Sequence, residues 1–387
     1  MTHFLKDILR QPEELQRTIQ LLTGPNGAGR SALDAATGAI RAARHVYLTG
    51  IGSSLHAALN VSTLFHQHAY PVYFEDAAEL LTFATFPNDS AMILISRSGK
   101  STEIVQLAAK ARRAGVNVIG ITNAAEGTLA KEAHVAVVVP IAFDHAISVN
   151  TYTTLALAAG MLANSVVTQN AGSTVTPGCG QRVSALDSAQ ARVPLPAKPS
   201  RPGLAESLSF SLAEAGRAIP RWQEQIAVST WLAPHTTTYF LARGSSLGSA
   251  YEARLMWEEG VKTPATAMGT GGFRHGPQEI VAKDVRFGLW IDGANMREQD
   301  LAVARDLREL GGSVMLIGQK LPEDAGDLVF QLPAIPAEWQ FLMDIIPAQL
   351  VAERLSRLSG VDCDTFRLSS YVVEDEGGLL PKKAGKN

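Results

Sequence analysis

The sequence predicts an α/β protein made of two tandem doubly wound domains, each with a parallel sheet flanked by helices. Short apolar runs rich in β-branched residues alternate with helix-like stretches along most of the chain. Strands of a parallel sheet covered on both faces give this pattern. The order begins again in the second half, and a similar Gly-Ser-Ser turn follows the first strand-like run of each half. A duplicated domain is therefore expected.

Residues 1–44 are expected to form helices ahead of the first sheet. Apolar residues at helical spacing predict an amphipathic helix over residues 4–22, interrupted or restarted near Pro12 because proline lacks the backbone donor that a helix interior needs. A second helix is predicted at about residues 31–43.

Residues 45–167 are expected to form the first domain. A buried helix over residues 148–167 closes it. The strands are expected in its short apolar runs, which are His45–Gly50, Val72–Phe74, Ala91–Ser96, Val116–Ile121 and His134–Val139.

The segment 168–206 is rich in Gly, Ser, Thr and Pro and is expected to be a linker. The second domain, residues 207–360, opens with a helix near residues 206–230. Its strands are expected at residues 238–242, 285–291, 313–318 and 328–332. Residues 361–387 form a C-terminal segment and a tail that we expect to fray.

Composition excludes several classes of protein. The 387 residues are 46% hydrophobic and 18% charged, which suits two buried cores. A net charge of -3 without a long basic run disfavours a nucleic-acid partner. No apolar run is long enough to span a membrane, and the N-terminus lacks the pattern of a signal peptide. Because Cys179 and Cys363 lie far apart, a reducing, cytoplasmic location is expected.

The hydroxyl-rich turn Ser96-Arg97-Ser98-Gly99-Lys100-Ser101 is the first candidate site. It follows a buried strand and precedes a helix. Backbone N–H groups at a helix start form an anion cradle, glycine permits close approach, and the hydroxyls and cations add donors. A phosphate is the natural ligand. The alternative is an ordinary Ser/Thr-capped turn, and the GxxxxGK[ST] pattern of a nucleotide-binding loop is absent.

A second turn, Gly50-Ile51-Gly52-Ser53-Ser54, also follows a strand. In an open parallel sheet the two turns should meet at the carboxyl edge and share one phosphate. The second half keeps Gly244-Ser245-Ser246 but has Ile291–Asn295 where the hydroxyl cluster would recur. We therefore expect one phosphate site per chain, with the second half donating catalytic residues.

These two turns, together with Gly271-Gly272-Phe273-Arg274-His275-Gly276-Pro277, resemble the SIS (sugar isomerase) superfamily. Within it, the chain is most similar to the isomerase half of glucosamine-6-phosphate synthase and to the free-standing amino-sugar-phosphate deaminase/isomerases of the AgaS type. The similarity runs from the helix at Gln11 to Asp362. It implies flavodoxin-like domains and a sugar-phosphate ligand.

The resemblance also implies roles for single residues. Glu259 matches the glutamate that moves a proton between C1 and C2, and His275 matches a histidine that assists ring opening in the neighbouring subunit's site, so a homodimer with a shared active site is implied. The positions that hold the 6-phosphate are Ser54, Ser96, Arg97, Ser98 and Ser101. Further substrate-site candidates are Gly52, Ser53, Gly99, Thr151, Arg274 and Ser369.

Elementary chemistry makes the two catalytic roles reasonable. Aldose–ketose interconversion removes a proton beside a carbonyl, which suits a partly buried carboxylate of raised pKa, and an imidazole can shuttle the ring hydroxyl proton. The alternative is that Glu252 and Glu259, seven residues apart, are surface acids on one helix face and that His275 is an ordinary loop residue. No cluster has metal-ligand spacing, so neither a metal nor another cofactor is expected.

The sequence also departs from the synthase. Thr2 stands where a glutaminase domain would begin with its cysteine, so glutamine is not expected as nitrogen donor. Met256 and Ser369 replace the two lysines expected near the sugar, and the segment 146–154 resembles the deaminase/isomerase group. Schiff-base chemistry is therefore in doubt.

The function expected from the sequence is an amino-sugar 6-phosphate isomerase or deaminase that yields a ketose 6-phosphate, with or without release of ammonia. Two alternatives stay open, a deglycase acting on fructosamine-type 6-phosphates and a non-catalytic sensor of sugar phosphates. The absence of a basic or helix-turn-helix extension argues against direct DNA binding by such a sensor.

Overall fold

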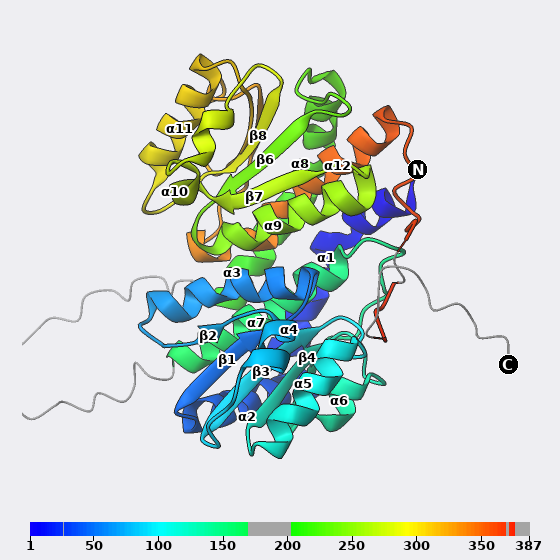
Figure 1. The fold of residues 1–387 in the computed structure, drawn as a ribbon, viewed down its shortest axis with the longest axis vertical. Coiled ribbons are helices and arrows are strands. Elements are labelled where there is room, and N and C mark those ends of the chain that lie inside the picture. The colour runs from blue at the N-terminus through cyan, green and yellow to red at the C-terminus, as the bar shows by residue number, and fades with distance from the viewer. Residues whose placement is uncertain (26, 169–202, 369–370, 376–387) are drawn as a thin grey trace, which may run out of the picture.

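Two five-stranded parallel sheets, one in each half of the chain, form the framework of the computed structural model (Figure 1). The structure describes residues 1–25, 27–168, 203–368 and 371–375. The strand order is β2-β1-β3-β4-β5 in the first sheet and β10-β9-β8-β6-β7 in the second. Counted from the first strand of each half, both sheets have the same order, which confirms the duplicated doubly wound architecture.

The first sheet carries the apolar runs of the first half. Its central strand β3 is buried along its whole length and pairs in parallel with β1 and β4, so that Ile93 lies between Leu48 and Ile119. The strands are β1 His45–Thr49, β2 Tyr73–Phe74, β3 Ser90–Ser96, β4 Asn117–Thr122 and β5 Val135–Val138. The helices are α3 Ser53–Gln67, α4 Ala77–Phe83, α5 Thr102–Arg113, α6 Thr128–Glu132 and α7 Asn150–Thr168.

The second half repeats this plan, with additional helical turns between its strands. Its strands are β6 Thr237–Ala242, β7 Ala265–Gly269, β8 Val285–Trp290, β9 Ser313–Gly318 and β10 Leu328–Gln331. Its α-helices are α8 Leu204–Val228, α9 Leu247–Met256, α10 Thr270–Phe273, α11 Arg297–Glu309 and α12 Ile345–Leu358. Its other helical turns are η2 Gly244–Ser246, η3 Trp257–Val261, η4 Pro277–Ile280 and η5 Ala337–Leu342.

Two sequence expectations need correction. Strand β7 was not among the predicted strands, because this edge strand is only partly buried and lacks a continuous apolar run. The N-terminal helix α1, His3–Thr23, is not broken at Pro12. Pro12 is buried and lies against Gly216 of α8, where a Cβ would come within 3.4 Å of the proline ring, so packing offsets the missing backbone hydrogen bond.

Helix α2 spans Ala28–Ala42, close to its predicted position. The expected linker lies mostly outside the described residues, so the domain boundaries stay a prediction. Within the part of the chain that the structure describes, no helix combines the length and apolar character that a membrane crossing requires.

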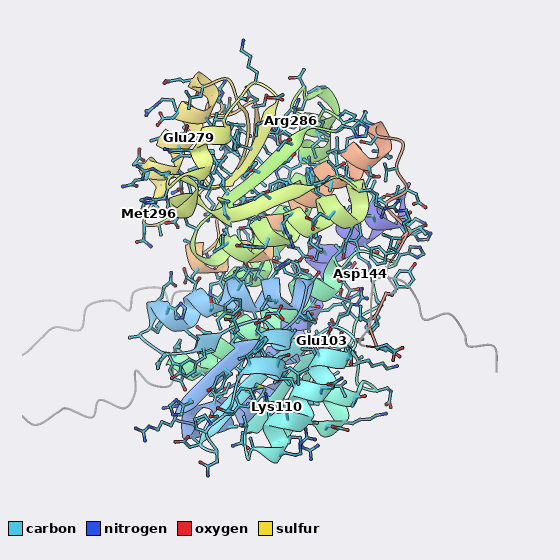
Figure 2. The ribbon with its side chains drawn as sticks, viewed as in Figure 1. Glu103, Lys110, Asp144, Glu279, Arg286 and Met296 are labelled. Atoms are coloured by element: carbon cyan, nitrogen blue, oxygen red, sulfur yellow. The ribbon has the colours of Figure 1, made fainter. Side chains whose placement is uncertain are left out.

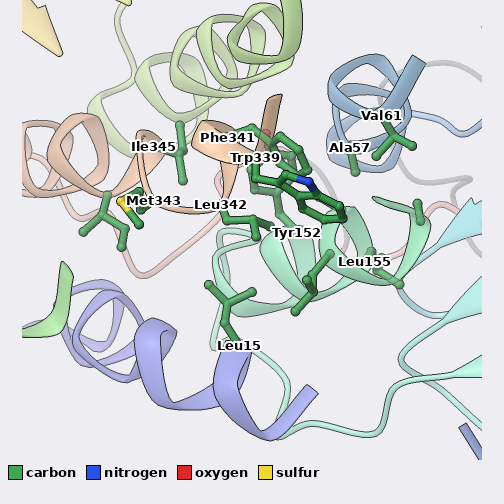
Figure 3. Close-up of a cluster of buried hydrophobic side chains, with 14 of the residues drawn as sticks. Leu15, Ala57, Val61, Tyr152, Leu155, Trp339, Phe341, Leu342, Met343 and Ile345 are labelled. Atoms are coloured by element: carbon green, nitrogen blue, oxygen red, sulfur yellow. The ribbon is translucent and has the colours of Figure 1, made fainter. Parts of the chain in front are cut away.

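One hydrophobic cluster joins the two halves (Figure 3). It contains Leu15 of α1, Val61 of α3 and Leu155 of α7 from the first half, and Trp339 and Phe341 of η5 from the second. All five side chains are buried. The two sheets are therefore held together by a continuous core.

The tightest point of this core yields a stability test. A Cβ on Gly160 of α7 would lie 2.8 Å from the Trp339 ring. Alanine normally stabilises a helix interior by about 1 kcal/mol relative to glycine, but overpacking costs about 1–3 kcal/mol. We expect Gly160→Ala to lower the midpoint of thermal unfolding. The matched control is Gly38→Ala in α2, where no atom lies within 4 Å and the substitution should stabilise. Equal stabilisation by both substitutions would contradict this packing.

Candidate active site

A cavity of about 300 Å³ lies where the carboxyl edge of the first sheet meets the second half. The first half contributes Gly52, Arg97, Ser101 and Ser148 to its walls, and the second half contributes Glu259. The C-terminal segment closes one side with Tyr371 to Val373. Figure 2 places Asp144 at the junction of the halves, and Glu103, another residue that lines the cavity, in the first turn of α5.

Two residues of the hydroxyl-rich turn, Arg97 and Ser101, line this cavity, whereas the predicted phosphate ligands Ser96 and Ser98 do not. Gly99 has a φ of +62°, which glycine adopts without strain. The Ser96 hydroxyl accepts a hydrogen bond from the Gly99 amide at 3.2 Å, and the Ser98 hydroxyl accepts one from the Lys100 amide at 3.1 Å. These two serines therefore shape the turn through their side chains.

Ser101 is placed differently from the other serines of the turn. It is the N-cap of α5, its side chain makes no capping hydrogen bond, and it lines the cavity. The next amide, of Thr102, donates to the Val373 carbonyl at 3.0 Å. The start of α5 therefore offers a hydroxyl and the positive end of a helix dipole to an anion, while the C-terminal segment lies across it.

Arg97 brings a fixed cation to the same cavity. Its guanidinium donates to Ser148 Oγ at 3.3 Å, to the Ala146 carbonyl at 3.5 Å and to the Tyr371 carbonyl. Burial lowers the pKa of Arg97, and the charges of Asp144 and Glu259 oppose that shift. Because a guanidinium remains protonated in proteins, the site keeps a positive charge.

Asp144 organises the loop that holds Arg97. Its buried carboxylate accepts hydrogen bonds from the amides of Val149 at 2.9 Å and Thr151 at 2.8 Å, and from the Thr151 hydroxyl at 2.7 Å. Thr151, a substrate-site candidate, thus directs its hydroxyl to Asp144. Sequence reasoning missed Asp144 and the role of Ser148, although an acid just before a helix start is a recognisable capping signal.

Glu259 carries the most perturbed carboxylate that lines the cavity. It lies on η3, a π-helical turn, rather than on the regular helix expected for it. Its pKa is raised to about 7, mainly by burial and then by the charge of Glu252, while Arg97 and Lys262 act in the opposite direction. The Lys262 ammonium also donates to the backbone carbonyls of Glu259 and Thr365.

Glu252 is not a surface acid, contrary to the alternative considered from the sequence. Its residue exposure is 0%. Ser53 Oγ donates to Glu252 Oε1 at 2.9 Å, and His56 Nδ1 lies 2.7 Å from Glu252 Oε2. The Ser53 hydroxyl, expected at the substrate, therefore binds a carboxylate of the second half.

The remaining candidates are spread more widely. Gly52, with a φ of +56°, lines the cavity, and Ser54 is buried in the first turn of α3. Arg274 and His275 are exposed and do not line this cavity. Ser369 lies outside the described residues. Among the residues that are described, no three His, Cys, Asp or Glu side chains gather as a metal site would require.

At the corresponding edge of the second sheet, the carboxylate of Asp292 binds backbone amides. Asp292 accepts hydrogen bonds from the amides of Asn295 and Met296, both at 2.8 Å. Arg243 there forms an ion pair with the buried Asp300 at 2.7 Å. These amides of the second half are therefore paired within the protein, and the expectation of a single phosphate site per chain stays a prediction.

Comparison with known proteins shows which family and which fold the chain resembles. Residues 39–165 match the SIS domain family. The glutamine–fructose-6-phosphate aminotransferase (isomerizing) of Symbiobacterium thermophilum is 26% identical over 393 aligned positions, which cover 96% of this chain and 59% of the relative. The chain thus spans about three-fifths of the length of such curated relatives.

Two solved structures share the fold across nearly the whole chain. The C-terminal domain of the glucosamine-fructose-6-phosphate aminotransferase from Francisella tularensis has a TM-score of 0.75 at 20% identity, covering 94% of this chain and 98% of that one. The glucosamine-6-phosphate deaminase from Thermotoga maritima has a TM-score of 0.73 at 20% identity, covering 96% and 99%. Residues 39–165 therefore match the SIS domain, and the chain has the fold of these two solved structures.

Proposed function

We propose that the chain is an amino-sugar 6-phosphate isomerase or deaminase that forms a ketose 6-phosphate. The observation that carries the proposal is one cavity holding both a phosphate-type cradle, with Ser101 and Arg97, and a largely buried carboxylate, Glu259, whose pKa is about 7. A base poised near neutral pH suits proton abstraction next to a carbonyl. The solved relatives named for aminotransferase and deaminase activities support this substrate class.

The proposed chemistry begins with the phosphate. Ser101, the start of α5 and Arg97 bind it, and this anchors one end of the open-chain sugar. Ionised Glu259 takes the proton from C2 and returns it to C1, so the aldehyde becomes an alcohol and the oxidation level moves to C2. With an amine at C2 the product is an imine. Water then adds to the imine, ammonia leaves, and a ketose 6-phosphate remains.

Two other functions are distinguished by assay. A deglycase would release an amine or amino acid from fructosamine-type 6-phosphates through the same base. A non-catalytic sensor would bind sugar phosphates without turnover. Measuring ammonia and ketose formation from glucosamine-, galactosamine- and fructosamine-type 6-phosphates separates the three, since no turnover of any of them by the wild type favours the sensor.

Replacing the base gives the first test of this function. We expect Glu259→Gln to lower kcat by roughly 10²–10⁴, the usual contribution of a positioned base, while binding of a sugar phosphate measured by calorimetry persists. The matched control is Glu258→Gln, because Glu258 is exposed, pairs with Arg254 at 3.5 Å and does not line the cavity. Full activity in the Glu259 variant would overturn its role.

The phosphate site gives a second test. We expect Ser101→Ala to raise KM roughly tenfold or more with little change in kcat, since a hydrogen bond to a charged group is lost equally in ground and transition states. The control is Ser245→Ala in the second half, whose hydroxyl donates to the Ala337 carbonyl at 3.2 Å. If Ser245→Ala raised KM more than Ser101→Ala, the phosphate would bind in the other half.

The position of His275 is the basis for proposing a dimer with a shared site. Since this exposed residue does not line the cavity of its own chain, we propose that a second copy brings it into the site for ring opening. Mixing the inactive variants Glu259→Gln and His275→Ala under exchange conditions should then restore about a quarter of wild-type activity, because half of the dimers hold one intact site. A mixture that stays inactive would argue against a shared site.

A further inference from the structure

The buried carboxylate of Glu252 joins the two halves without reaching the cavity. Its partners Ser53 and His56 both lie on α3, whereas Glu252 lies on α9. The hydrogen bonds of 2.9 Å and 2.7 Å engage one carboxylate oxygen each. Since Glu252 is fully buried and does not line the cavity, its carboxylate is committed to α3 and does not contact a substrate bound there.

The two helices approach so closely that this contact has little freedom. A Cβ on Gly248 of α9 would lie 2.2 Å from Asn60 Oδ1 and 2.3 Å from the His56 carbonyl oxygen. Asn60 in turn donates to Tyr152 Oη of α7 at 2.7 Å. The lateral position of Glu252 against Ser53 and His56 is therefore fixed by backbone packing.

The π-helical turn η3 separates Glu252 from Glu259. In an uninterrupted α-helix two residues seven positions apart would share a face. Trp257–Val261 forms a π turn, which contains an extra residue and rotates the following side chains. Glu252 can therefore bind α3 while Glu259 lines the cavity with Arg97, and the two carboxylates still interact electrostatically.

We propose that Ser53 and His56 are positioning residues that hold the Glu252 carboxylate near Glu259, so that the first half shapes the surroundings of the base carried by the second half. The inference rests on the proposed role of Glu259 as the base. Because a carboxylate only accepts hydrogen bonds, His56 donates from Nδ1 in this arrangement.

Several other charges face these groups. Arg97 and Lys262 lower the pKa of Glu259, and Glu258 raises it slightly. Around the pair, the Tyr251 ring lies 5.8 Å from the His56 ring, and the hydroxyl of Tyr152 senses the charge of Glu252. Among the causes that raise the pKa of Glu259, the charge of Glu252 is second only to burial.

The test measures kcat/KM as a function of pH and locates its acid limb, the pH range in which activity rises. Glu259 works as a base only when ionised, so activity rises with pH through its pKa of about 7. Glu252→Gln removes the neighbouring negative charge, which lowers that pKa and should move the limb about one unit toward acid. His56→Leu should act in the same direction, because it removes one of the two donors that hold the Glu252 carboxylate in place. His56→Asn keeps an N–H near the position of Nδ1 and should restore the limb.

A direct titration separates this inference from the proposed function. Carboxyl-carbon NMR of Glu259 in the full chain needs no turnover, so a shift in Glu252→Gln supports the positioning role even if no sugar phosphate is converted. The control is Tyr152→Phe, which loses the hydrogen bond from Asn60 in the same interface and should lower the unfolding temperature without moving the titration. An unchanged or raised pKa of Glu259 in Glu252→Gln would overturn the proposal, whatever the stability of His56→Leu.

Discussion

The packing of α3 against α9 is the constraint on which the rest of the site depends. The phosphate-type cradle follows β3 of the first sheet, and Glu259 follows α9 of the second half, so neither half holds both groups. The close contact at Gly248 and the bonds from Ser53 and His56 to Glu252 fix one half against the other. A small shift between these helices would move Glu259 relative to the cradle, and proton transfer tolerates such misplacement poorly.

Phosphate binding and a base of raised pKa place opposite electrostatic requirements on the site. A phosphate needs positive charge, which Arg97 and the start of α5 supply, yet a cation beside a carboxylate lowers its pKa. At Glu259 burial and the charge of Glu252 outweigh Arg97 and Lys262, and the pKa rises from 4.5 to about 7. In the proposed mechanism, burial of Glu259 and, after it, the charge of Glu252 allow a base active near neutral pH to lie beside the cations that bind the phosphate.

Local sequence patterns predicted most of the strands and the hydroxyl-rich turn after β3 because both arise within short segments. Buried strands such as β3 read as apolar runs, and the turn from Ser96 to Ser101 shows its hydroxyls directly. The edge strand β7 and the π turn η3 were missed because packing rather than local pattern decides them. The His56–Glu252 contact joins residues 196 positions apart, so no local pattern could reveal it, and Glu252 looked like a surface acid.

The two halves have diverged around the same framework in ways that depend on each other. Asp292 occupies the amides of the second sheet's edge, and Ser245 is bound to the Ala337 carbonyl, so that edge is satisfied without a ligand. The second half instead carries two carboxylates, Glu252 on α9 and Glu259 on the π turn that follows it. In the proposed mechanism these carboxylates act on a sugar whose phosphate is bound by the first half. The buried hydrogen bond from Ser53 to Glu252 also makes the first half part of the surroundings of the proposed base. The duplicated framework thus places a hydroxyl-rich turn of one half opposite two carboxylates of the other, and the cavity lies between them.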